Sequence, residues 1–341
     1  MSRLPQFDPI RRVNRSPHVV ILGAGASKAA FPTGDGNGKQ LPVLAELADC
    51  LDLAQAFRSA GFSDPANFES IYNELATTGR EPSLKGEIEF RVRSYFESLA
   101  LPDSPTLYDY LLLSLRDDDL IATFNWDPFL ARAFIRNRDV AHLPQMAFLH
   151  GNVEIAICAQ DRVKGFQGTI CQHCRQPLTP TRLLYPVQNK DYKTDRFIAS
   201  EWALLETYLS AAYMLTIFGY SAPTTDAAAV EILSRAWTGN PTFELGQVSI
   251  VDIKSEQEIE NTWQPFFCRS HYGIHTSVCT TWLFRHPRRS GEALAMATLR
   301  NNPWRNNPFP QFRSLSELHT WTAPLIAEER SGEFSGEPCP R

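Results

Sequence analysis

The positions of apolar residues along the chain predict short buried strands separated by helices. Five apolar runs have the length of a buried strand, at residues 18–22, 120–124, 147–149, 215–218 and 248–251. Between several of them apolar residues recur at helical spacing, as in Leu44, Leu47 and Leu51, in Trp202, Leu205, Leu209 and Ala212, and in Val230, Leu233 and Trp237. Strands that alternate with helices form parallel sheets covered on both faces. The pattern therefore predicts an α/β fold with a doubly wound, Rossmann-like parallel sheet.

The same pattern divides the chain into three parts. We expect an N-terminal arm at residues 1–15, a main domain at 16–300 and a C-terminal tail at 301–341. Within the main domain, residues 151–182 interrupt the alternation with a polar, glycine-containing stretch that holds a cysteine pair, so a small inserted module is expected there. The tail is rich in Pro and Asn and then in Glu and Gly, a composition that predicts disorder at its end.

Composition limits the possible partners. The net charge of −5 gives no general attraction to nucleic acid, so direct nucleic-acid binding is not expected. No run approaches the ~18 apolar residues of a membrane span, and no apolar segment of signal-peptide type follows the first basic residues. Seven mostly scattered cysteines are typical of a reducing compartment. We therefore expect a cytoplasmic protein.

The first apolar run ends abruptly in a glycine turn, GAGAS at residues 23–27. Glycines in such a turn let the backbone approach a phosphate, and the following helix directs N–H groups at it. It is not the dehydrogenase fingerprint, because Lys28 replaces the third glycine and because residues 42–57 have a helical pattern where a second strand is required. The candidates for phosphate binding are Gly23, Ala24, Gly25 and Ser27. A tight turn without a ligand is the alternative.

Polar residues follow the other apolar runs, where ligands bind in parallel sheets. Asn125 and Asp127 come after the second run, and Asp127 with Pro128 is also a typical start of a helix. His150 ends the third run and is suited to accept a proton near neutral pH, with a purely structural histidine as the alternative. Asp226 is expected to cap the helix that follows it. Further candidates for ribose or phosphate contact after the last two runs are Gly219, Ser221 and Asp252.

Three cysteines of the inserted module form a candidate metal site. Cys171 and Cys174 are a Cys-x-x-Cys pair, and Cys158 precedes them. Three thiolates and a fourth ligand, His173 or Asp161, could bind zinc tetrahedrally. A reduced cluster without a metal is the alternative. A nucleic-acid zinc knuckle is disfavoured, because no basic or aromatic surface accompanies the cysteines.

Taken in order, these stretches resemble the sirtuin family over roughly residues 15–290. GAGAS (23–27) is similar to its phosphate loop, TFNWD (123–127) to its T-Q-N-I-D segment, HG (150–151) to its catalytic histidine and GYS (219–221) to its G-T-S loop. The resemblance implies an NAD site between a doubly wound domain and a smaller module. It implies His150 as the base, Asn125 as the partner of the nicotinamide ribose, the glycine turn at the phosphates, and Ser221 with Asp252 toward the adenosine half.

Two stretches differ from the protein-deacylating sirtuins. FPTGDGNGKQLP follows the glycine turn in place of their G-I-P-D-F-R loop, and LLYPVQNKDY (183–192) stands where they have a peptide-binding cleft. In both respects the chain resembles bacterial sirtuin-like effectors of antiphage defence, which consume NAD. The resemblance thus implies hydrolysis of NAD to nicotinamide and linear or cyclic ADP-ribose. An NAD-dependent protein deacylase and a non-catalytic sensor of NAD or ADP-ribose are the alternatives.

An enzyme that destroys NAD harms its own cell unless it is restrained. The pattern shows no separate sensor domain that could provide this restraint. We therefore expect a homo-oligomer whose activity is controlled by a regulatory protein partner, for example a defence ATPase or a nucleic-acid-guided complex.

Overall fold

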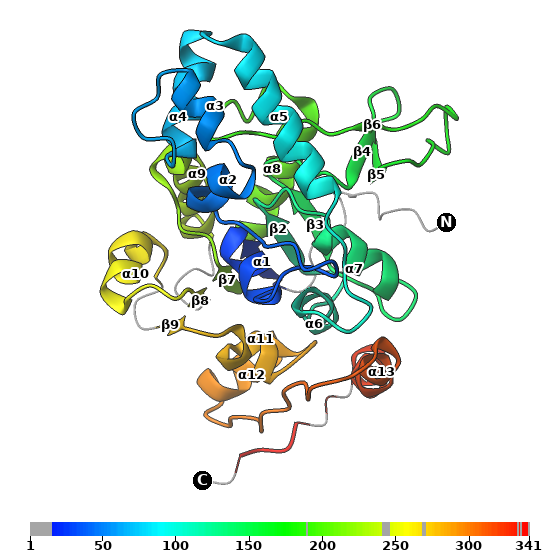
Figure 1. Ribbon diagram of the computed structural model, residues 1–341. Helices are drawn as coiled ribbons and strands as arrows, with labels where there is room; N and C mark the ends of the chain where they lie inside the picture. Colours follow the sequence, from blue (N-terminus) through cyan, green and yellow to red (C-terminus); the bar gives the residue numbers. More distant parts are fainter. Residues whose placement is uncertain are drawn as a thin grey trace.

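The computed structural model describes residues 16–188, 190–240, 246–267, 271–332, 334 and 336–339. The expected N-terminal arm, residues 1–15, lies outside them, as do positions 333, 335, 340 and 341 at the end of the tail. Within the described part, strands and helices alternate around a central sheet (Figure 1). The predicted α/β class is confirmed.

The central sheet has six parallel strands in the order β3-β2-β1-β7-β8-β9. Their bounds are β1 His18–Leu22, β2 Leu120–Thr123, β3 Gln145–Phe148, β7 Met214–Phe218, β8 Gln247–Val251 and β9 Tyr272–His275. Every residue of β1, β2, β7 and β8 is buried, which is why short, mostly apolar runs predict these strands. The apolar pattern does not predict β9, because this edge strand is only partly buried and contains a glycine.

The strand order creates a crevice at the middle of the sheet. From β1 the chain moves outward to β2 and β3, returns to β7 beside β1, and then moves outward the other way to β8 and β9. Right-handed crossovers place the connecting helices of the two halves on opposite faces. The loops after β1 and β7 consequently diverge and leave space for a ligand at their carboxyl ends.

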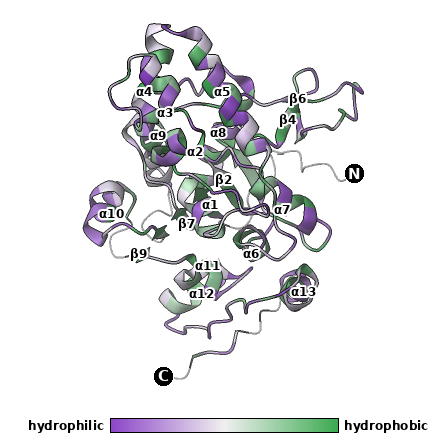
Figure 2. Ribbon diagram, in the orientation of Figure 1, coloured by the Kyte–Doolittle hydropathy of each residue, from purple (hydrophilic) through white to green (hydrophobic). Residues whose placement is uncertain are grey.

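Helices pack around this sheet, and its strands are coloured mostly as hydrophobic in Figure 2. α8 packs on β2 and β3, α9 packs on α8, and α6 packs on α7. The helices around the sheet are α1 Ala24–Ala30, α6 Leu107–Ser114, α7 Phe129–Asn137, α8 Arg196–Leu209, α9 Ala227–Thr238 and α10 Glu256–Trp263. Short 3₁₀ turns are η2 Thr224–Asp226, η4 Gln264–Phe266 and η5 Val278–Thr280.

The predicted helical region 42–57 is not one helix. It contains η1 (Leu44–Glu46), α2 (Leu47–Cys50) and the start of α3 (Ala54–Ser59). Asp52 has a φ of 51° at the break, a left-handed conformation that stops a helix and that Asp tolerates better than most residues. Two longer helices follow, α4 (Phe68–Thr78) and α5 (Pro82–Glu97), and they pack as a hairpin.

The inserted segment forms a second, small sheet to one side of the central sheet (Figure 1). Its strands are β4 (Ile155–Cys158), β5 (Val163–Phe166) and β6 (Thr179–Pro180), and both β5 and β6 pair antiparallel with β4. The insert has a small hydrophobic cluster of its own, which includes Cys158 and Cys171. It therefore holds its cysteines apart from the main core.

The C-terminal region adds three helices, α11 (Trp282–Arg285), α12 (Ser290–Thr298) and α13 (Leu315–Ser331). Arg288 donates to Glu329 (2.5 Å) and Arg289 to Glu328 (3.1 Å), so the basic cluster before α12 anchors α13. The apolar pattern of the tail does not predict α13. Among the described residues, none of the helices combines the length and the apolar character needed to cross a bilayer.

Candidate functional site

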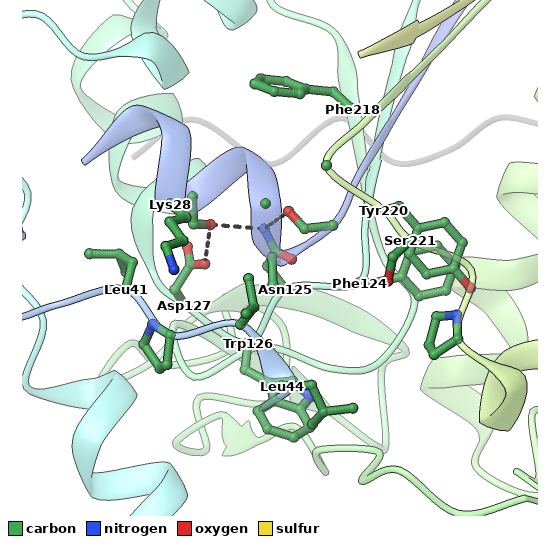
Figure 3. Close-up of a pocket in the computed structure, with 18 of the residues that line it drawn as sticks. Lys28, Leu41, Leu44, Phe124, Asn125, Trp126, Asp127, Phe218, Tyr220 and Ser221 are labelled. Carbon is green, nitrogen blue, oxygen red and sulfur yellow. Dashed lines mark hydrogen bonds between the residues drawn. The ribbon is translucent and has the colours of Figure 1, made fainter. Parts of the chain in front are cut away.

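A cavity of about 700 Å³ lies at the carboxyl ends of β1, β2, β7 and β8. It occupies the crevice between β1 and β7, where the chain order reverses. The structure brings all ten predicted catalytic and cofactor-binding residues into its lining: Gly23, Ala24, Gly25, Ser27, Asn125, Asp127, His150, Gly219, Ser221 and Asp252. Residues far apart in the sequence thus share one cavity (Figure 3).

The glycine turn is held directly against the turn that follows β7. The amide of Gly23 donates to the carbonyl of Phe218 (3.0 Å), and that of Gly25 donates to the carbonyl of Gly219 (2.9 Å). A Cβ atom on Gly219 would lie 2.2 Å from the nitrogen of Ala26, and φ at Gly219 is +63°. These glycines therefore allow two backbones to touch. Because Gly23 and Gly25 already donate within the protein, fewer amides remain for a phosphate than the sequence pattern suggests.

A buried hydrogen-bond network supports the floor of the cavity (Figure 3). Asn125 Nδ2 donates to the carbonyl of Gly23 (3.0 Å) and to Ser27 Oγ (2.9 Å). The Ser27 hydroxyl donates to Asp127 (2.6 Å), so the Tyr108 hydroxyl, 2.6 Å away, donates to Ser27. The Ser27 oxygen is thereby saturated, and its predicted contact with a phosphate is not available in this arrangement.

This network fixes the orientation of Asn125 and influences the pKa of Asp127. Both amide protons of Asn125 are directed at protein acceptors, and its Oδ1 has no hydrogen bond to the described residues. Burial raises the pKa of Asp127 to about 6, partly offset by the hydrogen bond from Ser27. Asp127 also accepts from the amide of Phe129 (3.3 Å) at the start of α7, so it has the helix-starting role that the sequence indicates as well as a place in the cavity.

His150 lies at the other side of the cavity among aromatic rings. Its ring is edge-on to Phe124 (4.8 Å between centroids) and parallel to Tyr192 (6.1 Å). Burial lowers the pKa of His150 to about 3, although the Asp226 carboxylate acts in the opposite direction. The ring is therefore neutral at physiological pH. Its Nε2 is buried and has no hydrogen-bond partner among the described residues, so it can accept a hydrogen bond from a ligand.

A buried ion pair beside His150 is absent from the sequence prediction. Lys190 forms an ion pair with Asp226, and both side chains are at most 5% exposed. Asp226 also accepts from the Tyr220 hydroxyl (3.1 Å). Asp226 stands at the N-cap position of α9, but its side chain makes no capping hydrogen bond. The expected cap is therefore wrong in function although right in position, because Lys190 and Tyr220 engage the carboxylate instead.

The predicted adenosine-side residues lie at the open part of the cavity. Ser221 is exposed, and Asp252 is half-buried directly after β8. The Asp252 carboxylate accepts from the amide of Lys254 (3.1 Å), which holds the loop in a turn. Ile253 between them is 93% exposed and lines the same cavity. These residues are accessible to a ligand without any rearrangement of the core.

The inserted sheet brings its three cysteines together with a carboxylate. The thiols of Cys158, Cys171 and Cys174 and a carboxylate oxygen of Asp161 all lie within 4.8 Å of one another. Sulfur ligands of a tetrahedral zinc ion are about 3.8 Å apart, so this set of donors fits zinc. Asp161, rather than His173, completes the group. The cluster could hold a zinc ion with a structural role, since all four positions are taken by the protein.

No protein-family model and no curated protein matches the chain. Solved structures show a distant likeness to sirtuins over most of its length. A structure on the basis of sirtuin substrate affinity has 15% identity and a TM-score of 0.42, and the alignment covers 78% of this chain and 91% of that one. A Sir2 homologue in complex with NAD has 15% identity and a TM-score of 0.34, covering 86% and 93%. A Sir2 protein with a deacetylated p53 peptide and acetyl ADP-ribose has 13% identity and a TM-score of 0.36, covering 77% and 90%.

Proposed function

We propose that this protein binds NAD in the cavity between β1 and β7 and hydrolyses its nicotinamide–ribose bond. The observation that supports the proposal most is the neutral His150, whose buried Nε2 has no partner and borders the same cavity as Asn125 and the glycine turn. The ordered resemblance to sirtuin motifs gives NAD as the substrate. The volume of about 700 Å³ is within the range of cavities that hold ligands of this size.

The residues divide the reaction between them. Cleavage breaks the bond between ribose C1′ and the nicotinamide nitrogen, and water forms a new C1′–O bond. Nicotinamide leaves as a neutral ring, and one proton is released from the attacking water. Asn125 Oδ1 orients a ribose hydroxyl or this water, and the neutral His150 assists the removal of the proton. The turns at Gly23 and Gly219 hold the diphosphate half.

The test measures nicotinamide release from NAD by the purified protein, with chromatography to separate and quantify the product. His150→Ala is expected to reduce release at least 100-fold, which is a typical contribution of a general base. His142→Ala is the matched control, because His142 is exposed and lies outside the cavity lining. Release that persists in both His150→Ala and Asn125→Ala would reject the mechanism. Release that requires an acyl-lysine peptide would indicate a deacylase, and NAD binding without release would indicate a sensor.

We further propose that the activity serves antiphage defence and is restrained by self-assembly or a protein partner. The support is the resemblance to NAD-consuming effectors and the toxicity of NAD loss. Nicotinamide release should then rise when lysate from phage-infected cells is added, and His150→Ala should abolish the rise. Equal release with infected and uninfected lysate would reject a trigger that infection supplies.

A further inference from the structure

A second cavity of about 1030 Å³ lies beside the first, between the α4–α5 hairpin and residues 182–188, 190 and 191. Two residues line both cavities, Leu184 and Lys190. They belong to the stretch that replaces the peptide-binding cleft of deacylating sirtuins. We call these two residues, one apolar and one charged, the wall shared by the two cavities.

The segment that carries this wall is attached on both sides. On the side of the second cavity, the Tyr185 ring stacks on Tyr72 of α4 (4.7 Å), and the amide of Gln188 donates to Asn73 (3.0 Å). On the side of the first, the amide of Leu184 donates to the carbonyl of His150 (2.9 Å). The chain around the wall is thus held at Leu184, Tyr185 and Gln188, and the Lys190 side chain lies between the two cavities.

Lys190 is held between the two cavities by a chain of contacts that reaches His150. Its ammonium pairs with Asp226, which also accepts from Tyr220. The Tyr220 ring stacks on Phe124 (4.0 Å), and Phe124 is edge-on to His150. A buried ion pair is seldom more stabilising than apolar side chains of the same size. Its presence here indicates a role other than stability.

We propose that Lys190, held by Asp226, determines which acceptor receives the ADP-ribose group. Its side chain closes the wall, so that water reaches ribose C1′ and a bulky hydroxyl compound from the second cavity does not. This inference rests on the proposed NAD cleavage. With an alcohol as acceptor, the C1′–nicotinamide bond breaks, a C1′–O–alkyl bond forms, nicotinamide leaves, and the alcohol proton is released as it is from water.

The acceptor test compares methanol with benzyl alcohol as competitors of water. The wild-type protein should form methyl ADP-ribose but little benzyl ADP-ribose. Lys190→Ala should raise the benzyl-to-methyl product ratio by about tenfold or more. A pocket that differs in size by one methylene group already discriminates between substrates by about tenfold. Lys85→Ala is the matched control, since Lys85 lines the second cavity only. An unchanged ratio in Lys190→Ala, or a wild-type ratio already as high, would overturn the inference.

A second measurement does not depend on turnover. Lys190→Met and Asp226→Asn should each lower the urea midpoint of unfolding, because each leaves one buried charge without its partner. The double variant should lose less than the sum of the two. Additive losses would overturn the inference, because they would show that Lys190 and Asp226 do not interact. If the losses are non-additive but no variant releases nicotinamide, the ion pair stands, while the proposed function and the role of the wall in it are rejected.

Discussion

The contact between the glycine turn and Gly219 predicts a large and specific cost for one added methyl group. In Gly219→Ala the new Cβ would lie 2.2 Å from the nitrogen of Ala26 and 2.4 Å from the carbonyl carbon of Gly25, both backbone atoms. Gly38→Ala is the matched control, because Gly38 also has a positive φ (+78°) but has no atom within 4 Å of the added Cβ. The two variants therefore share the backbone strain and differ in the clash.

The magnitudes follow from these two terms. An alanine in the left-handed conformation destabilises the folded state by about 1–2 kcal/mol. Alanine also lowers the conformational entropy of the unfolded chain, which offsets about half of this loss. Gly38→Ala should therefore lower the free energy of unfolding by about 1 kcal/mol. Overpacking against a fixed backbone adds about 1–3 kcal/mol, so Gly219→Ala should lose about 3 kcal/mol in all. Urea unfolding followed by circular dichroism measures both losses.

The same change should impair the proposed site. Relief of the clash requires the turn at Gly25 to move away from β7, which breaks the hydrogen bond from Gly25 to the carbonyl of Gly219. NAD affinity should fall at least about tenfold at temperatures where the variant is still folded, since each 1.4 kcal/mol of lost binding is tenfold. Equal stability losses in Gly219→Ala and Gly38→Ala would refute the interlocked turns and the cavity floor built on them.

Two further predictions concern the insert and pH. The purified protein should contain about one zinc per chain. Cys171→Ser or a strong chelator should make residues 151–182 sensitive to protease while the main sheet stays folded. A metal-free protein whose insert resists protease would contradict this prediction. Burial lowers the pKa of both His18 and His150 to about 3, so the unfolded chain binds more protons below pH 6.5 and stability should fall as pH drops from 7 to 5. At pH 5 each histidine lowers the free energy of unfolding by about 2 kcal/mol. The raised pKa values of Asp119 and Asp127 offset part of this loss, because these carboxyls bind protons more readily in the folded protein. A thermal midpoint that is unchanged between pH 7 and 5 would count against the two buried neutral rings, and His150→Gln should reduce the fall.

The elements that the sequence predicts are those with a clear apolar pattern, either a short apolar run or apolar residues at helical spacing. β1 and β7 at the centre of the sheet show as mostly apolar runs, and the polar residues that follow them line one cavity because the carboxyl ends of parallel strands meet at one edge of the sheet. β9 and α13 are not predicted, because each buries only part of its surface and carries polar residues within it. Burial on one side leaves a weaker pattern than burial on both.

The site residues that escape prediction act through contacts with distant parts of the chain. Tyr108 sits in a leucine-rich helix, where a tyrosine is an ordinary core residue, and only the fold brings its hydroxyl to Ser27. Lys190 is one more charge in a polar stretch, and its meaning depends on Asp226, 36 positions later. The sequence offers a signal for Asp226 alone, and that signal points to a helix cap. Long-range polar pairs of this kind have no local spacing to detect.

Polar atoms left without partners give the strongest physical reason to expect a ligand in this cavity. Among the described residues, six buried side-chain atoms have no hydrogen bond, and three of them lie at or beside this cavity: Nε2 of His150, Nε1 of Trp126 and the hydroxyl of Tyr192. The first two belong to residues that line the cavity, and Tyr192 stacks on His150. Each such atom costs about 1–3 kcal/mol in the folded protein, and a polar ligand or water that pairs with it recovers that energy. A ligand whose polar groups meet the three atoms at this cavity would therefore stabilise the folded protein.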